Sequence, residues 1–141
     1  MITEIDELTL NALSQGNGSE RFSGVLSNPP YQLATGSGED GKKKFSLQIF
    51  PLFQEVANVV APYTSMVYPA NWQKDITKEL GQHLLSHGLK LSDYYHGDVL
   101  FGAAIRKNFP ISVVYTDERY DGPVFINGSP RDRKNKVWIG S

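Results

Sequence analysis

The stretch that decides the fold is Ser27-Asn28-Pro29-Pro30-Tyr31, which follows the short apolar run Phe22-Ser23-Gly24-Val25-Leu26. This order predicts a buried strand that stops abruptly, because proline fixes φ and lacks the backbone N–H that continues a ladder. The side chains of Asn28 and Tyr31 are then held just beyond the carboxyl end of that strand. In an open α/β sheet this is the edge at which ligands bind.

The motif also carries a simple recognition chemistry. Asn28 offers a side-chain acceptor and the proline turn offers free carbonyls, so together they can hold an amino group from two directions. The ring of Tyr31 can stack on a planar heterocycle. Asn, Pro and Ser are also ordinary turn residues, so a plain loop is the alternative for these residues taken alone.

With its surroundings, the motif resembles the Asn-Pro-Pro-Tyr motif of the adenine-specific, amino-group DNA methyltransferases of restriction-modification systems. The resemblance covers about residues 22–116 and is most specific over residues 27–32. It implies a Rossmann-like sheet whose fourth strand ends at the motif. It also implies that Asn28 and Pro29 bind the adenine amino group, within a catalytic tetrapeptide that includes Pro30, and that Tyr31 stacks on the flipped base. Similar tetrapeptides occur in methyltransferases that act on RNA bases or on protein glutamine.

A glycine-rich stretch, residues 34–41, separates the motif from the next element and is a loop by composition. Apolar residues then recur at the spacing of an amphipathic helix with one apolar face. They are Phe45, Ile49, Leu52, Phe53, Val56 and Val60. Pro51 either stands in the first turn of this helix or kinks it, and Ala61-Pro62 ends it.

The remaining elements complete an α/β pattern. Residues 63–68 read as a strand stopped by Pro69-Ala70-Asn71-Trp72, a segment that the family also has, with a basic residue frequent where this chain has Asn71. Residues 75–87 have helical spacing, with Gly88 as the C-terminal cap. Residues 89–95 and 111–115 read as strands. We therefore expect a partial Rossmann-like methyltransferase sheet with flanking helices and a final antiparallel strand pair.

Three segments are expected along the chain: an acidic N-terminal segment (1–19), a methyltransferase catalytic half (20–116) and a polar C-terminal extension (117–141). Within the catalytic half, Val99-Leu100-Phe101-Gly102 resembles the family's stretch with an aromatic that contacts the flipped base opposite the motif tyrosine. Phe101 is the candidate for this role and Phe109 is its competitor. Core packing is the alternative for both.

The overall charge gives no reason to expect nucleic acid, since the net charge is -1 and the pI is about 6.3. Local clusters are candidates for DNA phosphate contacts: Lys42, Lys43 and Lys44, and also Arg106 and Lys107. Solvated loops are the alternative for each cluster. The absence of cysteine excludes thiolate metal sites and disulfides and fits a cytoplasmic protein.

His83 and His87 are four residues apart on a predicted helix, as a pair of metal ligands would be, but no third ligand is evident and no metal is expected. No apolar run approaches the length of a membrane span, so no membrane partner is expected.

The resemblance implies S-adenosylmethionine as the methyl donor. Family members bind it with a glycine-rich turn and acidic residues, usually located before the motif, yet only 26 residues precede Ser27 here. The cofactor-binding residues are therefore unknown. We expect the catalytic half of a DNA adenine methyltransferase, inactive alone, with the cofactor half on a second chain or a missing upstream region. The alternatives are a fragment of an RNA or protein-glutamine methyltransferase, and a non-catalytic binding or assembly module.

Overall fold

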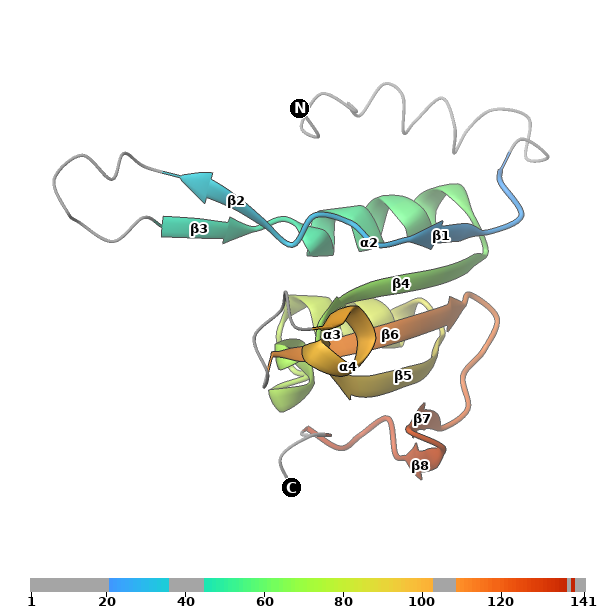
Figure 1. The fold of residues 1–141 in the computed structure, drawn as a ribbon. Coiled ribbons are helices and arrows are strands. Elements are labelled where there is room, and N and C mark those ends of the chain that lie inside the picture. Colours follow the sequence, from blue (N-terminus) through green and yellow to red (C-terminus); the bar gives the residue numbers. More distant parts are fainter. Residues whose placement is uncertain (1–20, 36–44, 103–108, 137, 139–141) are drawn as a thin grey trace, which may run out of the picture.

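The structure, a computed structural model, describes residues 21–35, 45–102, 109–136 and 138. A six-stranded mixed sheet has the order β1-β4-β6-β5-β7-β8, and a separate two-stranded hairpin, β2 with β3, extends away from it (Figure 1). The strands are β1 (Val25–Ser27), β2 (Gln32–Thr35), β3 (Phe45–Gln48), β4 (Tyr63–Pro69), β5 (Leu89–His96), β6 (Pro110–Asp117), β7 (Val124–Ile126) and β8 (Ser129–Arg131). The helices are α2 (Phe50–Val60), α3 (Glu79–Ser86), α4 (Gly97–Phe101) and the 3-10 turn η3 (Asn71–Lys74).

Strand direction confirms the predicted fold class and the antiparallel pair. Strand β1 runs parallel to β4, whereas β6 is antiparallel to both β4 and β5, so β1, β4 and β5 point the same way. The antiparallel pair is β5 with β6. The carboxyl ends of the three co-directional strands therefore lie at one edge of the sheet.

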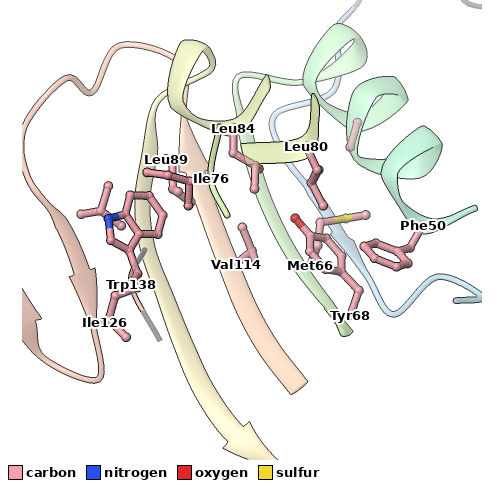
Figure 2. Close-up of a cluster of buried hydrophobic side chains, with 12 residues drawn as sticks. Phe50, Met66, Tyr68, Ile76, Leu80, Leu84, Leu89, Val114, Ile126 and Trp138 are labelled. Atoms are coloured by element: carbon pink, nitrogen blue, oxygen red, sulfur yellow. The ribbon is translucent and has the colours of Figure 1, made fainter. Parts of the chain in front are cut away.

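One face of the sheet carries the core. Alternate residues of β4 and β6 face the helices, and Met66 lies opposite Val114 in the register. Helix α3 adds Leu80 and Leu84, and α2 adds Phe50 (Figure 2). Each large apolar side chain buried in this way contributes about 1.5–3 kcal/mol. Packing against the sheet thus holds both helices, although neither has a side-chain cap at its N-terminus.

Helix α2 begins at Phe50 with Pro51 in its first turn and ends at Ala61, so the first of the two alternatives for Pro51 is confirmed. Phe45, which was included in the helical spacing, does not belong to the helix, because it lies in β3 and pairs with Thr35 in the β2–β3 hairpin. The hairpin also takes up residues 34–35, which were expected to be loop. This hairpin pairs residues 32–35 with residues 45–48, and the helical spacing of apolar residues gives no sign of such strand pairing.

The buried face of α2 is only partly apolar. Gln54 and Asn58 are buried on it, while Leu52, expected on that face, is 37% exposed. The prediction of one apolar face is therefore wrong for these positions. Polar residues can occupy a core when their hydrogen bonds are satisfied, which hydropathy alone does not show.

The strand before the motif exists but is not buried as expected. Within the part of the chain that the structure describes, strand β1 has one neighbour in the sheet, β4, and Leu26 is 84% exposed. Leu26 is level with Ser65, which alternates with the helix-facing Thr64 and Met66. From the sequence alone, an apolar strand at the edge of a sheet thus cannot be distinguished from a buried strand.

Helix α3 is shorter than predicted, since residues 75–78 form a turn in which Thr77 donates to Asp75 from its backbone nitrogen (3.0 Å). Gly88, with φ of 78°, follows the helix as expected. No helix among the described residues is long and apolar enough to cross a membrane.

Residues after Asp117, expected as a polar extension, contribute two strands and three members of the core cluster, Val124, Ile126 and Trp138. Strand β7 pairs in parallel with β5, and β8 forms a hairpin with β7. The turn between them is Asn127-Gly128, both with positive φ (47° and 82°), as a tight hairpin requires. Trp138 is 2% exposed and belongs to the core cluster.

Candidate functional site

The motif lies where the sequence places it, beyond the carboxyl end of β1. Because β1, β4 and β5 are co-directional, this edge also carries η3, which follows β4, and α4, which follows β5. Ligand sites of open α/β sheets are formed from such segments at the carboxyl ends of strands. The candidate site is therefore on the expected edge.

Within the motif, the side chains of Asn28 and Tyr31 meet. The Tyr31 hydroxyl donates a hydrogen bond to Asn28 Oδ1 at 3.1 Å. Burial raises the pKa of Tyr31, so the hydroxyl keeps its proton at neutral pH and can act as this donor. Asn28 itself is exposed, which leaves its amide within reach of a ligand.

The two prolines shape the turn differently. Pro29 is buried and Pro30 is exposed. Neither can donate from its backbone nitrogen, so the backbone of the turn presents acceptors. A group with two N–H bonds, such as an exocyclic amine, matches this arrangement of Asn28 Oδ1 and a neighbouring carbonyl.

The residues at the start of helix α2 contact Tyr31 through a backbone hydrogen bond and an aromatic ring. The Ile49 backbone nitrogen donates to the Tyr31 carbonyl at 3.0 Å. The rings of Tyr31 and Phe50 are nearly perpendicular, with centroids 6.3 Å apart and an interplanar angle of 81°. The position of the motif tyrosine thus depends on residues that follow it by about twenty positions, which the sequence motif does not reveal.

Phe101, the predicted second stacking residue, lies at the same edge of the sheet, but the strand that precedes it, β5, is not adjacent to β1. Phe101 ends α4, after β5, and is 39% exposed. Strands β4 and β6 lie between β1 and β5, so β1 and β5 are about 14 Å apart at the usual spacing of strands. Phe109 is half-buried just before β6, one strand closer to the motif. The choice between these two aromatics stays a prediction.

The predicted phosphate contacts fall outside the described residues, both Lys42 to Lys44 and Arg106 with Lys107. A further basic cluster lies near the C-terminus. Its central residue, Arg133, donates to the carbonyl oxygens of Leu89 (2.7 Å), Leu85 (3.2 Å) and Tyr120 (3.3 Å). These bonds give Arg133 a structural role.

A cavity of about 690 Å³ lies beside the motif and was not predicted from the sequence. It is bordered by the start of α2, the end of β4 and the start of α3, with Phe50, Trp72, Leu80 and Lys78 among its lining residues. Phe50 is thus shared between this cavity and the contact with Tyr31. In the sequence, Phe50 and Trp72 could have pointed to this cavity, but both look like ordinary core residues.

The two histidines of α3 stack on each other, with ring centroids 4.0 Å apart. His83 Nε2 lies 2.9 Å from Asn58 Oδ1 and must donate to it, because that oxygen can only accept. Burial, and then the charge of His87, lower the pKa of His83 from 6.5 to about 4. No group of three potential metal ligands is found within the part of the chain that the structure describes.

The described residues do not fit an S-adenosylmethionine site of the expected kind. The strands that lead into helices among them do so at Ile49, Ala70 and His96-Gly97, and none of these turns is glycine-rich. The polar groups that these residues present at the motif are the side chain of Asn28 and the carbonyl oxygens of the proline turn.

Two known proteins resemble this chain. A protein of Mycoplasma pneumoniae described as an uncharacterized adenine-specific methylase is 39% identical over 56 residues, which are 39% of this chain and 13% of that protein. The methyltransferase subunit of a type I restriction-modification system from Streptococcus thermophilus matches 88% of this chain, with a TM-score of 0.52 at 13% identity. No protein-family profile matches.

The chain spans a minor part of both relatives, since it covers 30% of the Streptococcus thermophilus subunit. At 13% identity that likeness shows the fold alone, a methyltransferase-like sheet. The sequence match is independent of it and adds the adenine-specific class. Together they agree with the resemblance stated from the sequence: the chain is similar in part of its sequence to an adenine-specific methylase, and in fold to a methyltransferase subunit.

Proposed function

We propose that this chain is the target-base half of a site-specific DNA adenine methyltransferase. The observation that carries the proposal is the pairing of Asn28 and Tyr31 at the carboxyl end of β1, at 3.1 Å. The similarity to two methyltransferases supports methyl transfer, and one of them, described as adenine-specific, supports adenine as the acceptor.

The chain's own residues would hold and orient the adenine amino group. Its lone pair is delocalised into the ring, so the nitrogen is a poor nucleophile. Asn28 Oδ1 and the Pro29 carbonyl would each accept one amino proton, which favours a more pyramidal nitrogen with a directed lone pair. An amide oxygen has two lone pairs, so Asn28 can accept from the base while it still accepts from Tyr31.

The ring of Tyr31 would stack on the base after it leaves the duplex. Flipping a base costs a few kcal/mol, and stacking on an aromatic ring offsets about 1–3 kcal/mol of it. Phe101 or Phe109 would contact the opposite face of the base. Lys42 to Lys44, Arg106 and Lys107 would contact DNA phosphates.

S-adenosylmethionine would supply the methyl group from a cofactor half carried by a second chain or by another region of the same polypeptide. The edge of β1 opposite β4, which pairs with no other described strand, is the surface that we propose for this half. Leu26 is 84% exposed there, and Phe22 is 54% exposed. A strand edge beside exposed apolar side chains is suited to pair with a further strand. Replacing Leu26 by Asp should weaken assembly with the cofactor half in size-exclusion chromatography, and unchanged assembly would contradict this surface.

The experiment that tests the function combines the chain with the proposed S-adenosylmethionine-binding half, labelled S-adenosylmethionine and duplex DNA. We expect adenine methylation that is lost in Asn28→Ala, by on the order of 10²-fold or more, as for removal of one essential hydrogen-bonding group. Tyr31→Ala should reduce it strongly. Asn135→Ala, a change of another exposed asparagine, is the control that should keep full activity. Full activity in Asn28→Ala would refute the mechanism, and label in RNA or in glutamine instead of DNA would refute the substrate.

A further inference from the structure

The buried face of α2 carries two amides, Gln54 and Asn58, and every side-chain nitrogen and oxygen of both has a hydrogen-bond partner. Gln54 Nε2 donates to Asn58 Oδ1 (2.9 Å) and to Thr64 Oγ1 (3.1 Å). Asn58 Nδ2 donates to Thr116 Oγ1 (3.0 Å). These bonds join α2 to the central strands β4 and β6, because Thr64 and Thr116 lie opposite each other in the register. A satisfied buried network of this kind fixes one register of helix on sheet.

The network ends on an aromatic ring. The Tyr68 hydroxyl donates to Gln54 Oε1 at 2.9 Å, which uses the remaining polar atom of that amide. Tyr68 is fully buried, so this bond holds its ring in one orientation. One turn earlier on α2, Phe50 stacks on the same ring, with centroids 4.8 Å apart and an interplanar angle of 24°. Figure 2 shows the two rings side by side beneath the start of α2.

Phe50 contacts both the fixed ring of Tyr68 and the motif residue Tyr31. One face of its ring is covered by Tyr68, and Tyr31 approaches it nearly at right angles. Either the edge of Tyr31 meets the second face of Phe50, or the edge of Phe50 meets one face of Tyr31. In both arrangements Phe50 leaves at least one face of the Tyr31 ring free for a base.

We propose that Phe50 is a positioning residue for Tyr31, and that Tyr68 and Gln54 act through Phe50. The rings of Tyr68 and Phe50 connect the hydrogen-bonded core to the Tyr31 ring without contacting the base themselves. This inference rests on the proposed function, because it assigns to Tyr31 the stacking role. It adds that the orientation of the ring is set by α2 and β4 and not by the motif alone.

The first test observes Tyr31 directly in the full chain labelled with ¹³C-tyrosine. Loss of a neighbouring ring removes its ring current, so Phe50→Leu should move the Tyr31 ring resonances in NMR spectra. Tyr68→Phe, which keeps the stacked ring and removes only the hydroxyl, should move them less. Leu84→Ala changes a fully buried core residue on α3 and is the matched control, which should leave them in place. Unmoved resonances in Phe50→Leu, or equal movement in Leu84→Ala, would overturn the inference.

The second test is methylation by the chain assembled with its cofactor half. Phe50→Leu should lower kcat about two- to tenfold, the range that corresponds to loss of one aromatic contact, with KM for S-adenosylmethionine unchanged. Phe50→Tyr keeps the ring, and the cavity that Phe50 lines has room for the added hydroxyl, so it should restore the rate. Full kcat in Phe50→Leu while the parent methylates DNA would overturn the positioning role alone. A parent assembly that methylates no DNA overturns both proposals.

Discussion

Protonation of His83 should weaken the fold as the pH falls from 7 to 5. This ring is half-buried between Asn58, to which it donates, and His87, on which it stacks. Burial and the neighbouring charge lower its pKa from 6.5 to about 4. The imidazole is therefore more basic in the unfolded chain than in the folded one.

The sign and size of the effect follow from linkage. Between about pH 6.5 and about pH 4 the unfolded chain binds a proton that the folded chain does not, so stability is complete above this window and is lost as the pH falls. The full shift would remove roughly 2 kcal/mol between pH 7 and pH 5. Because His83 is only half-buried, solvent screening reduces this, and we expect about 1 kcal/mol. Asp75 and Glu118, whose pKa values are lowered by hydrogen bonds to Thr77 and Arg21, act mainly below pH 5.

Urea unfolding followed by tryptophan fluorescence measures the loss. With a slope of about 2 kcal/mol per molar urea for a small domain, the midpoint should fall by about 0.5 M between pH 7 and pH 5. His83→Gln should abolish most of this fall, because an amide can donate to Asn58 but does not titrate. His96→Gln, which leaves His83 in place, is the matched control and should fall like the parent. An equal fall in His83→Gln and the parent would refute the assignment.

Three further predictions concern stability and use thermal or urea denaturation. Trp138→Ala should cost about 3–5 kcal/mol, since this 2%-exposed ring belongs to the core, and a melting temperature equal to that of Lys136→Ala would contradict the packing. Gly88→Ala should cost at least about 2 kcal/mol, because φ is 78° and the new Cβ would lie 1.7 Å from the Asp117 carbonyl oxygen. Gly128→Ala, with φ of 82° and nothing within 4 Å, should cost only about 1 kcal/mol, so equal losses at the two glycines would contradict the clash. Arg133→Met should cost about 2 kcal/mol by removing bonds to several carbonyls, while Arg131→Met should stay within about 0.5 kcal/mol, and a reversed order would be the contrary result.

Much of the sheet edge that carries the candidate site could be predicted from the sequence because its signals are local. A short apolar run that stops at two prolines predicts both the strand and the turn after it, and β1 with its motif is found there. The strand at β4 and the pair β5 with β6 are alternating or apolar runs bounded by breakers, which short-range rules detect. The order of these elements supported the resemblance.

The remaining features depend on contacts between distant residues. Gln54 and Asn58 look like solvent-facing positions of an amphipathic helix, yet they are buried because Thr64 and Thr116 meet them from two strands. Trp138 looks like part of a polar tail, yet its backbone nitrogen donates to the Gln73 carbonyl at 3.1 Å and its ring joins the core. In each case the hydrogen-bond partner lies in another element of the chain. The spacing of apolar residues within one element therefore gives no information on the contact.

The position of the motif depends on α2 more than on β1. Strand β1 has three residues and, among the described strands, pairs only with β4, so its own ladder holds the turn weakly. Helix α2 bonds to the chain on both sides of that strand: the Phe22 nitrogen donates to the Val60 carbonyl at 2.9 Å, and the Ile49 nitrogen donates to the Tyr31 carbonyl at 3.0 Å. Since the buried amides of α2 fix that helix on the sheet, they also fix the segment that carries Asn28. Changes in the middle of α2 should therefore alter the acceptor site although they lie in the core, which is why Gln54 belongs to the same functional unit as the motif.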